Sequence, residues 1–162
     1  MKRFSIILLT AMMVIGIIPK SVNAATIETP VGTVVSETVE YLPDGSSIIT
    51  TVIDETVPTR AATYTKTGSK VHSQVNSSGD IMWQFTVRGT FSVNPGVSAT
   101  CTAVSHSVNI VNDAWENESA SSWRSSNKAC GTATCVRKVL FITVETREAN
   151  VTLTCDSNGN LS

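Results

Sequence analysis

The chain has 162 residues, of which 41% are hydrophobic and 15% charged, and its formal net charge is −1 at pH 7. Loss of Lys2, Arg3 and Lys20 with an N-terminal leader would leave 9 of the 12 basic residues against 13 acidic ones, a net charge of −4. This mildly acidic balance argues against nucleic acid and anionic lipid as partners.

Residues 1–24 have the pattern of a secretory signal peptide. A short basic start precedes an apolar run, and Val22 and Ala24 stand at the positions that signal peptidase reads. The run of about 15 residues is shorter than the ~20 that a membrane-spanning helix needs. We therefore expect export, cleavage after Ala24, and a secreted, extracellular mature chain (25–162) that does not engage a membrane.

The mature chain has the composition of an all-β domain. Ser and Thr supply 39 of the residues from 25 to 162, and Val is the commonest apolar type. Val and Thr are β-branched and suit the pleated surface of a sheet. No stretch has a convincing helical pattern.

Residues 25–60 contain two β-rich runs around "LPDGSS", a turn signal. This pattern predicts an N-terminal β-hairpin or a mobile segment. The following "VPTRAATYTKTGSK" (57–70) lacks periodicity and is interpreted as an irregular lead-in to the main domain, 61–162.

From about residue 69 short strands alternate with turns such as "NSSGD" and "NPG". The clearest strand is 81–93, where Gly89 predicts a bend or a close backbone approach. In the next run, 97–111, the alternation of apolar and polar residues shifts near Val104, which indicates a bulge. One face of 81–93 carries the apolar residues Ile81, Trp83, Phe85, Val87, Phe91 and Val93.

The last third of the chain is less regular. Residues 112–131 are polar and mixed, so no element is assigned there. Residues 139–144 are apolar on both faces, which is typical of a central strand, and "ANVTLTC" closes the domain. The whole pattern predicts an antiparallel β-sandwich of immunoglobulin-like architecture, with a small barrel as the alternative.

Four cysteines in an exported chain predict two disulfides. Cys101 and Cys155 both have core-facing parity in their strands, so we expect them to pair. That leaves Cys130 to pair with Cys135 in a small loop. Structural zinc is disfavoured, because no second close pair of ligands accompanies Cys130 and Cys135.

"RGTFSVNPGVSATCTAVSHSV", a Trp after an "ND" turn, and the final "VTLTCDSNGNLS" together carry a resemblance. They are similar to an uncharacterised family of small secreted all-β proteins from Gram-positive bacteria of the clostridial kind, with a C-terminal "LTCxxNGxLS" strand. The resemblance spans roughly residues 60–162. It implies export and an all-β fold, and it supplies no catalytic residue. Val93 stands where the family tends to have Tyr, and Cys130 and Cys135 are not associated with it.

Motifs for metals and cofactors are weak. Asp156, Asn158 and Asn160 alternate like the start of a calcium loop, but no later Glu completes the ligand set. Asn158–Gly159 is also a strong turn signal. We expect a turn or a frayed tail there, no metal and no cofactor.

Catalytic candidates are few. A Ser or Cys nucleophile needs a neighbouring base, and only His72 and His106 are present. The acidic residues Asp113, Glu116 and Glu118 read as a solvated loop rather than as a glycosidase pair. The sequence therefore predicts a protein that is not an enzyme.

The tryptophans are the most suggestive side chains. Trp83 has core parity, whereas Trp115 and Trp123 lie in a polar stretch, where an exposed ring can stack on a sugar or anchor a protein. The alternative is that each covers an edge of the core. These residues predict an exported binding or surface-interaction module for a cell-surface glycan or protein. The alternative function is a secreted effector, such as an inhibitor or antibacterial protein.

Overall fold

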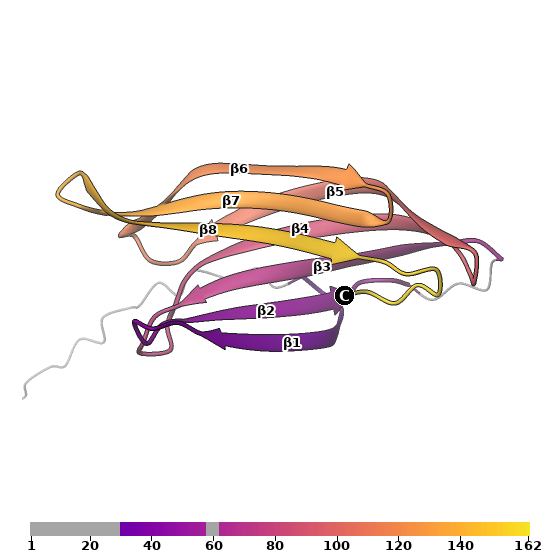
Figure 1. Cartoon of the computed structure of the whole chain (residues 1–162), viewed down its shortest axis with the longest axis horizontal. Helices are drawn as coiled ribbons and strands as arrows, with labels where there is room; N and C mark the ends of the chain where they lie inside the picture. Colours follow the sequence, from indigo (N-terminus) through magenta and orange to yellow (C-terminus); the bar gives the residue numbers. More distant parts are fainter. Residues whose placement is uncertain (1–29, 58–61) are drawn as a thin grey trace, which may run out of the picture.

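The computed structural model describes residues 30–57 and 62–162. The predicted signal peptide therefore lies outside the described residues. The described chain forms eight antiparallel strands in two sheets (Figure 1), ordered β1-β2-β3-β4-β5 and β6-β7-β8, and this confirms the all-β prediction. No helix long and apolar enough to cross a membrane occurs in the described part. The strands are β1 (Thr33–Tyr41), β2 (Ser47–Asp54), β3 (Tyr64–Val75), β4 (Ile81–Asn94), β5 (Ser98–Ile110), β6 (Trp115–Ser125), β7 (Lys128–Val139) and β8 (Ile142–Thr154).

The hairpin formed by β1 and β2 is the outer part of the larger sheet, because β2 pairs with β3 from Ser47 to Asp54. Its turn is fixed by Asp44, whose carboxylate accepts the backbone N–H of Ser46 at 3.0 Å. The "NSSGD" turn forms in the same way, since the Asn76 side chain accepts two backbone N–H groups. A short polar residue that bonds its own backbone is the physical content of both turn signals.

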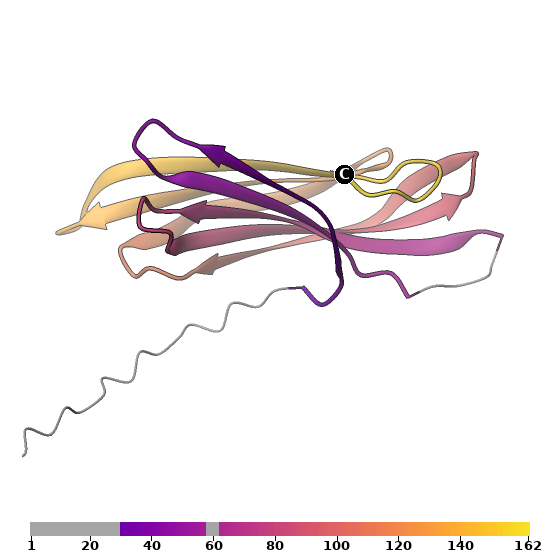
Figure 2. The same cartoon turned by 90° about the horizontal axis from the view of Figure 1, so that it is seen from below.

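The core lies between the two sheets and is centred on β4. Its odd-numbered apolar residues from Trp83 to Val93 are fully buried, which confirms the predicted face of this strand. Side chains of β7 and β8 meet them from the smaller sheet. Figures 1 and 2 show the smaller sheet lying against β3–β5, while β1 and β2 extend past it.

Two glycines let the sheets approach closely. A Cβ on Gly89 would lie 2.8 Å from the Ala129 Cβ, so the predicted close approach is confirmed. A Cβ on Gly131 would lie 2.7 Å from Val87 Cγ2 and 3.0 Å from Phe85 Cζ. Small residues at this contact set the spacing of β4 and β7.

Gly131→Ala is expected to lower the free energy of unfolding by about 1–3 kcal/mol, because the new methyl overpacks the contact with Phe85 and Val87. Urea unfolding of the wild type and the variant measures the change. Lys128→Ala, at an exposed position of the same strand, is the control and should change little. An unchanged Gly131→Ala midpoint would mean that the sheets are not in close contact there.

Three predictions about strands are wrong. Residues 64–70 are not an irregular lead-in but the first half of β3. The polar stretch 112–131 contains β6 and the start of β7. Residues 139–144 do not form a central strand, because the chain reverses between β7 and β8 at Leu140 and Phe141, which are exposed.

The predicted bulge in β5 is present two residues before Val104. Phe91 pairs with Cys101 while Thr90 pairs with Ala103, so Thr102 is the extra residue. The shift keeps Cys101 opposite the buried Phe91 and on the core side.

The predicted Cys130–Cys135 bridge is wrong for this fold. Both residues belong to β7, which pairs with a neighbouring strand at each of them. Five residues of strand span ~16 Å, whereas a disulfide needs Cα atoms within about 7 Å. All four cysteines lie in the described region as unbridged thiols.

Candidate functional site

Four chain reversals gather at one end of the molecule (Figure 1). They are the β1–β2, β3–β4, β5–β6 and β7–β8 connections, which the antiparallel order of the strands brings together. A pocket of about 240 Å³ opens between the sheets at this end. Its lining residues are Asp44, Ser46, Gln74, Val75, Asn76, Ser77, Met82, Trp115, Arg137 and Glu145.

One wall of the pocket is a row of three residues across the smaller sheet. Arg137 on β7 is the cross-strand partner of Trp115 on β6 and of Glu145 on β8. Neighbouring strands lie ~4.8 Å apart, so an aromatic ring, a guanidinium and a carboxylate are held side by side. Regular strand pairing, rather than loop conformation, fixes this row.

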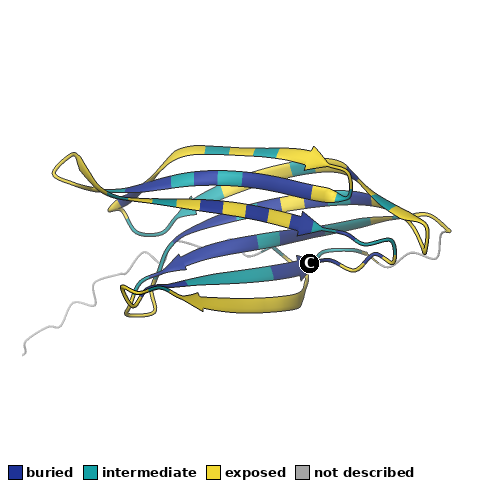
Figure 3. Ribbon diagram, in the orientation of Figure 1, coloured by how far each residue is buried: buried dark blue, intermediate teal, exposed yellow. Residues whose placement is uncertain are grey.

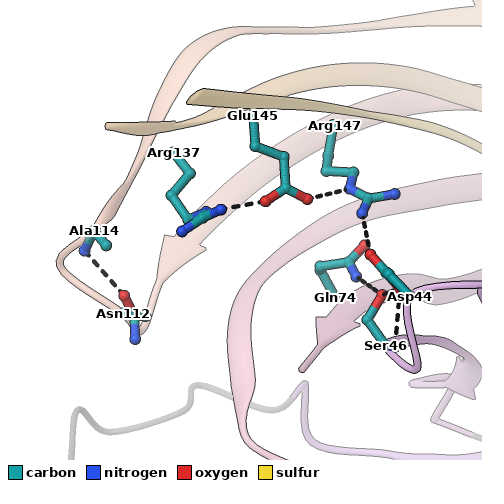
Figure 4. Close-up of polar contacts among 8 residues, drawn as sticks. All are labelled: Asp44, Ser46, Gln74, Asn112, Ala114, Arg137, Glu145 and Arg147. Carbon is teal, nitrogen blue, oxygen red and sulfur yellow. Dashed lines mark hydrogen bonds and ion pairs between the residues drawn. The ribbon is translucent and has the colours of Figure 1, made fainter. Parts of the chain in front are cut away.

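A chain of polar contacts runs from this row to the opposite sheet (Figure 4). The Arg137 Nε donates to Glu145 at 2.9 Å, and the Arg147 Nε donates to the other carboxylate oxygen at 2.7 Å. Arg147 also reaches Asp44 in the β1–β2 turn at 2.6 Å. The Gln74 amide donates to Ser46 Oγ at 3.4 Å, which links this series of polar contacts to β3.

Positive and negative side chains alternate along this series of polar contacts. Hydrogen bonds from Ser46, followed by Arg147, hold the pKa of the Asp44 carboxyl below its usual value. The hydrogen bond to Glu145 raises the pKa of the Arg147 guanidinium above its ordinary range. Asp44 and Arg147 are therefore ionised near neutral pH.

Trp115 and Trp123 do not form one binding surface. Trp115 is 7% exposed, packs on Trp83 with ring centroids 6.2 Å apart, and lines the pocket. Trp123 is 48% exposed and lies eight residues further along β6, ~26 Å away in an extended strand. Only Trp115 belongs to the polar end.

The two histidines lie outside the pocket lining. His72 is buried against Trp83, with ring centroids 5.4 Å apart, and burial lowers its pKa to about 4. The His106 Nδ1 lies 2.8 Å from Ser122 Oγ, a contact that links β5 to β6. This Ser–His contact has no hydrogen-bonded carboxylate behind the imidazole among the described residues.

The predicted acidic cluster is exposed and divided. Asp113 lies in the β5–β6 turn, whereas Glu116 and Glu118 lie on β6. Glu116 forms an ion pair with Lys138 on β7. The carboxylates therefore show no paired arrangement around a cleft.

The final "DSNGN" forms a closed turn rather than a frayed tail. The Asp156 carboxylate accepts the backbone N–H groups of Asn158 and Asn160, each at 2.8 Å. Leu161 then enters the core beside Cys155. Across the described ranges, no three His, Cys, Asp or Glu side chains are grouped in a way that suits a metal ion.

Cys101 and Cys155 lie on either side of the β6–β7 turn. The Cys101 N–H donates to the Ser126 carbonyl at 2.8 Å, and the Cys155 N–H donates to the Asn127 carbonyl at 3.0 Å. Burial raises the pKa of both thiols, that of Cys155 to about 11. Both residues are in the buried core cluster, as their parity predicted.

The fold and the site define a class: an all-β protein of two packed antiparallel sheets with a polar pocket at one end. Asp44, Gln74, Arg137, Glu145 and Arg147 were not singled out in the sequence, because their meeting depends on strand register. No family model, curated protein or solved structure matches the chain.

Proposed function

We propose that this chain is an exported, non-enzymatic binding module that holds a saccharide of a cell-surface glycan in the end pocket. The observation that carries this proposal is the row formed by Trp115, Arg137 and Glu145. The row lines a pocket of about 240 Å³, and Asp44, Ser46 and Gln74 of the larger sheet line the same pocket. Binding sites of this kind combine an apolar surface with a few precisely placed polar groups.

The chemistry of the pocket favours a polyhydroxylated ligand. Arginine, carboxylate and amide groups offer planar sets of donors and acceptors, which suit neighbouring hydroxyls. Trp115 and Met82, which both line the pocket, add an apolar surface for the carbon face of a sugar ring. A purely charged ligand is disfavoured, because the ion pairs already match positive and negative groups.

Binding without catalysis is supported by the state of Asp44 and Glu145, the two carboxylates among the lining residues of the pocket. Glu145 has both oxygens engaged by guanidinium groups, and Asp44 is engaged by Ser46 and Arg147. Neither is placed as a free acid or base toward a ligand, which general acid–base chemistry requires.

The proposal includes the finer architecture. We propose that the two sheets form an immunoglobulin-like β-sandwich of the small secreted clostridial type, closed in its oxidised form by a Cys101–Cys155 disulfide. Packing of core residues from both sheets and the positions of the two thiols beside one turn support this. Oxidation joins the two sulfurs, and the two electrons and two protons go to a thiol oxidant such as oxidised glutathione.

Co-sedimentation of purified residues 25–162 with whole cells, peptidoglycan and insoluble polysaccharides tests the function. The protein is expected to pellet with at least one glycan material. Arg137→Gln and Glu145→Gln are each expected to weaken binding roughly tenfold or more, since each removes a charge-assisted bond of about 1.5–3 kcal/mol.

Trp123→Ala is the matched control, because it removes an aromatic ring from β6 outside the pocket. It should pellet like the wild type. Loss of binding in Trp123→Ala alone would move the site to the outer face of β6. A wild-type protein that stays in solution with every material would end the glycan proposal.

A further inference from the structure

The connection between β7 and β8 is the most apolar exposed feature of the described chain. Leu140, Phe141 and Ile142 are 85%, 99% and 67% exposed, and Val139 and Val144 flank them. Figure 3 shows this exposed hairpin end projecting from the body, and Figure 1 places it at the pocket end. We call residues 139–144 the apolar tip.

The backbone conformation of the apolar tip is unfavourable for the two residues at its turn. Val139 pairs with Ile142, so Leu140 and Phe141 form a two-residue turn, with φ of +47° and +69°. Turns with positive φ at both residues favour Asn-Gly, because larger side chains are strained there. Leu-Phe at this turn is unfavourable both for the backbone and for hydration, so the fold alone gives no reason for it.

The surroundings of the apolar tip suit a lipid surface. No acidic residue occurs from 138 to 144, so insertion would desolvate no carboxylate. Val139 pairs with Ile142 and Lys138 pairs with Thr143, so the strand ends that carry the turn satisfy backbone groups within the sheet, which a nonpolar environment favours.

Charged residues directly behind the apolar tip limit how deeply it can insert into a lipid layer. The Arg137–Glu145 pair and the Lys138–Glu116 pair lie two to three residues behind the turn. At ~3.3 Å per residue this is roughly 7–10 Å, which matches the ~5–10 Å depth of the boundary between headgroups and acyl chains. Arg137 and Lys138 would then lie at the level of the lipid phosphates.

A protein partner fits the apolar tip less well. A stable protein interface buries about 800 Å² on each side, and a two-residue turn with its flanking side chains is much narrower. A bilayer needs no complementary shape, and each fully buried Leu, Ile or Phe favours it by roughly tenfold or more.

We propose that the apolar tip inserts into the outer layer of a lipid bilayer and holds the pocket end against a membrane surface. This goes beyond glycan binding, does not depend on it, and departs from the expectation that the mature chain avoids membranes. Insertion is shallow and reversible, because three side chains anchor a protein only weakly.

Flotation of residues 25–162 with vesicles of phosphatidylcholine, and of equimolar phosphatidylcholine and phosphatidylglycerol, tests the proposal. The wild type is expected to float with vesicles of both compositions. Leu140→Asn/Phe141→Gly is expected to lower the partition coefficient by about 100-fold or more, since two apolar side chains are lost. Its melting temperature should not fall, because Asn-Gly suits the turn.

Val97→Asn is the matched control, because Val97 is 71% exposed in the β4–β5 turn at the opposite end. It should float like the wild type. In a second readout, Phe141→Trp should shift its emission to the blue when vesicles are added.

The proposal is overturned if the wild type stays with the soluble fraction for both vesicle types. It is also overturned if Leu140→Asn/Phe141→Gly floats as well as the wild type, which would indicate a surface attraction elsewhere. Pelleting with glycans is scored separately in vesicle-free samples, so failure of one proposal is distinguishable from failure of the other.

Discussion

Oxidised protein is expected to be more stable than reduced protein by about 4 kcal/mol, because the proposed Cys101–Cys155 bridge would close a loop of roughly 50 residues. The bridge would join β5 of the larger sheet to the segment that follows β8 of the smaller one. It therefore restrains the unfolded chain across both sheets. Urea unfolding with and without reductant measures the difference in the free energy of unfolding.

A set of cysteine variants discriminates between the possible partners in this bridge. Cys101→Ser/Cys155→Ser should make the stability independent of reductant, while Cys130→Ser should keep the full difference. Peptide mapping under non-reducing conditions identifies the linked residues directly. Equal stability of the oxidised and reduced wild type would contradict the bridge, and loss of the difference in Cys130→Ser would reassign it.

The fold was predictable from the sequence where one side of a strand faces the core and the other faces polar surroundings. In β4 the alternation from Trp83 to Val93 assigns the core-facing residues, and burial follows it except at Gln84, which is buried on the opposite face. The Asp44 and Asn76 turns were also readable, because the signal there is a side chain that bonds its own backbone. Both signals are local.

The errors in the predicted strands also have physical causes. β6 is mostly exposed, so its sequence lacks apolar alternation, and backbone pairing with β7 holds it in place. The run from Val139 to Val144 is apolar, which is typical of a buried strand, and no Gly or Asn marks its reversal. A run of apolar residues normally indicates a buried strand, but the apolar residues between Val139 and Val144 are exposed.

The candidate site was largely hidden because its members are far apart in the chain. Asp44 and Arg147 are separated by 103 positions and meet only because of sheet packing. Trp115 was identifiable because a large aromatic residue in a polar stretch is unusual. Its partners Arg137 and Glu145 are ordinary residues whose role depends on register alone.

Acidification from pH 7 to pH 4 is expected to destabilise the protein by up to about 3 kcal/mol through His72 alone. Burial lowers the pKa of this imidazole from 6.5 to about 4, so the unfolded chain takes up its proton first. The stabilisation is therefore complete above pH 6.5 and is lost progressively as the pH falls toward 4. Urea unfolding at several pH values across this window measures the slope.

His72→Gln removes the titrating group and should flatten the slope between pH 6.5 and 4.5, with lower stability at pH 7 because the stacking on Trp83 is lost. His106→Gln is the control, since His106 is exposed, and it should keep the slope of the wild type. Asp44, Asp54 and Asp156 have lowered pKa values, and their contribution is lost mainly at the acid end of the range. A slope that persists in His72→Gln above pH 5 would show that His72 is not its source.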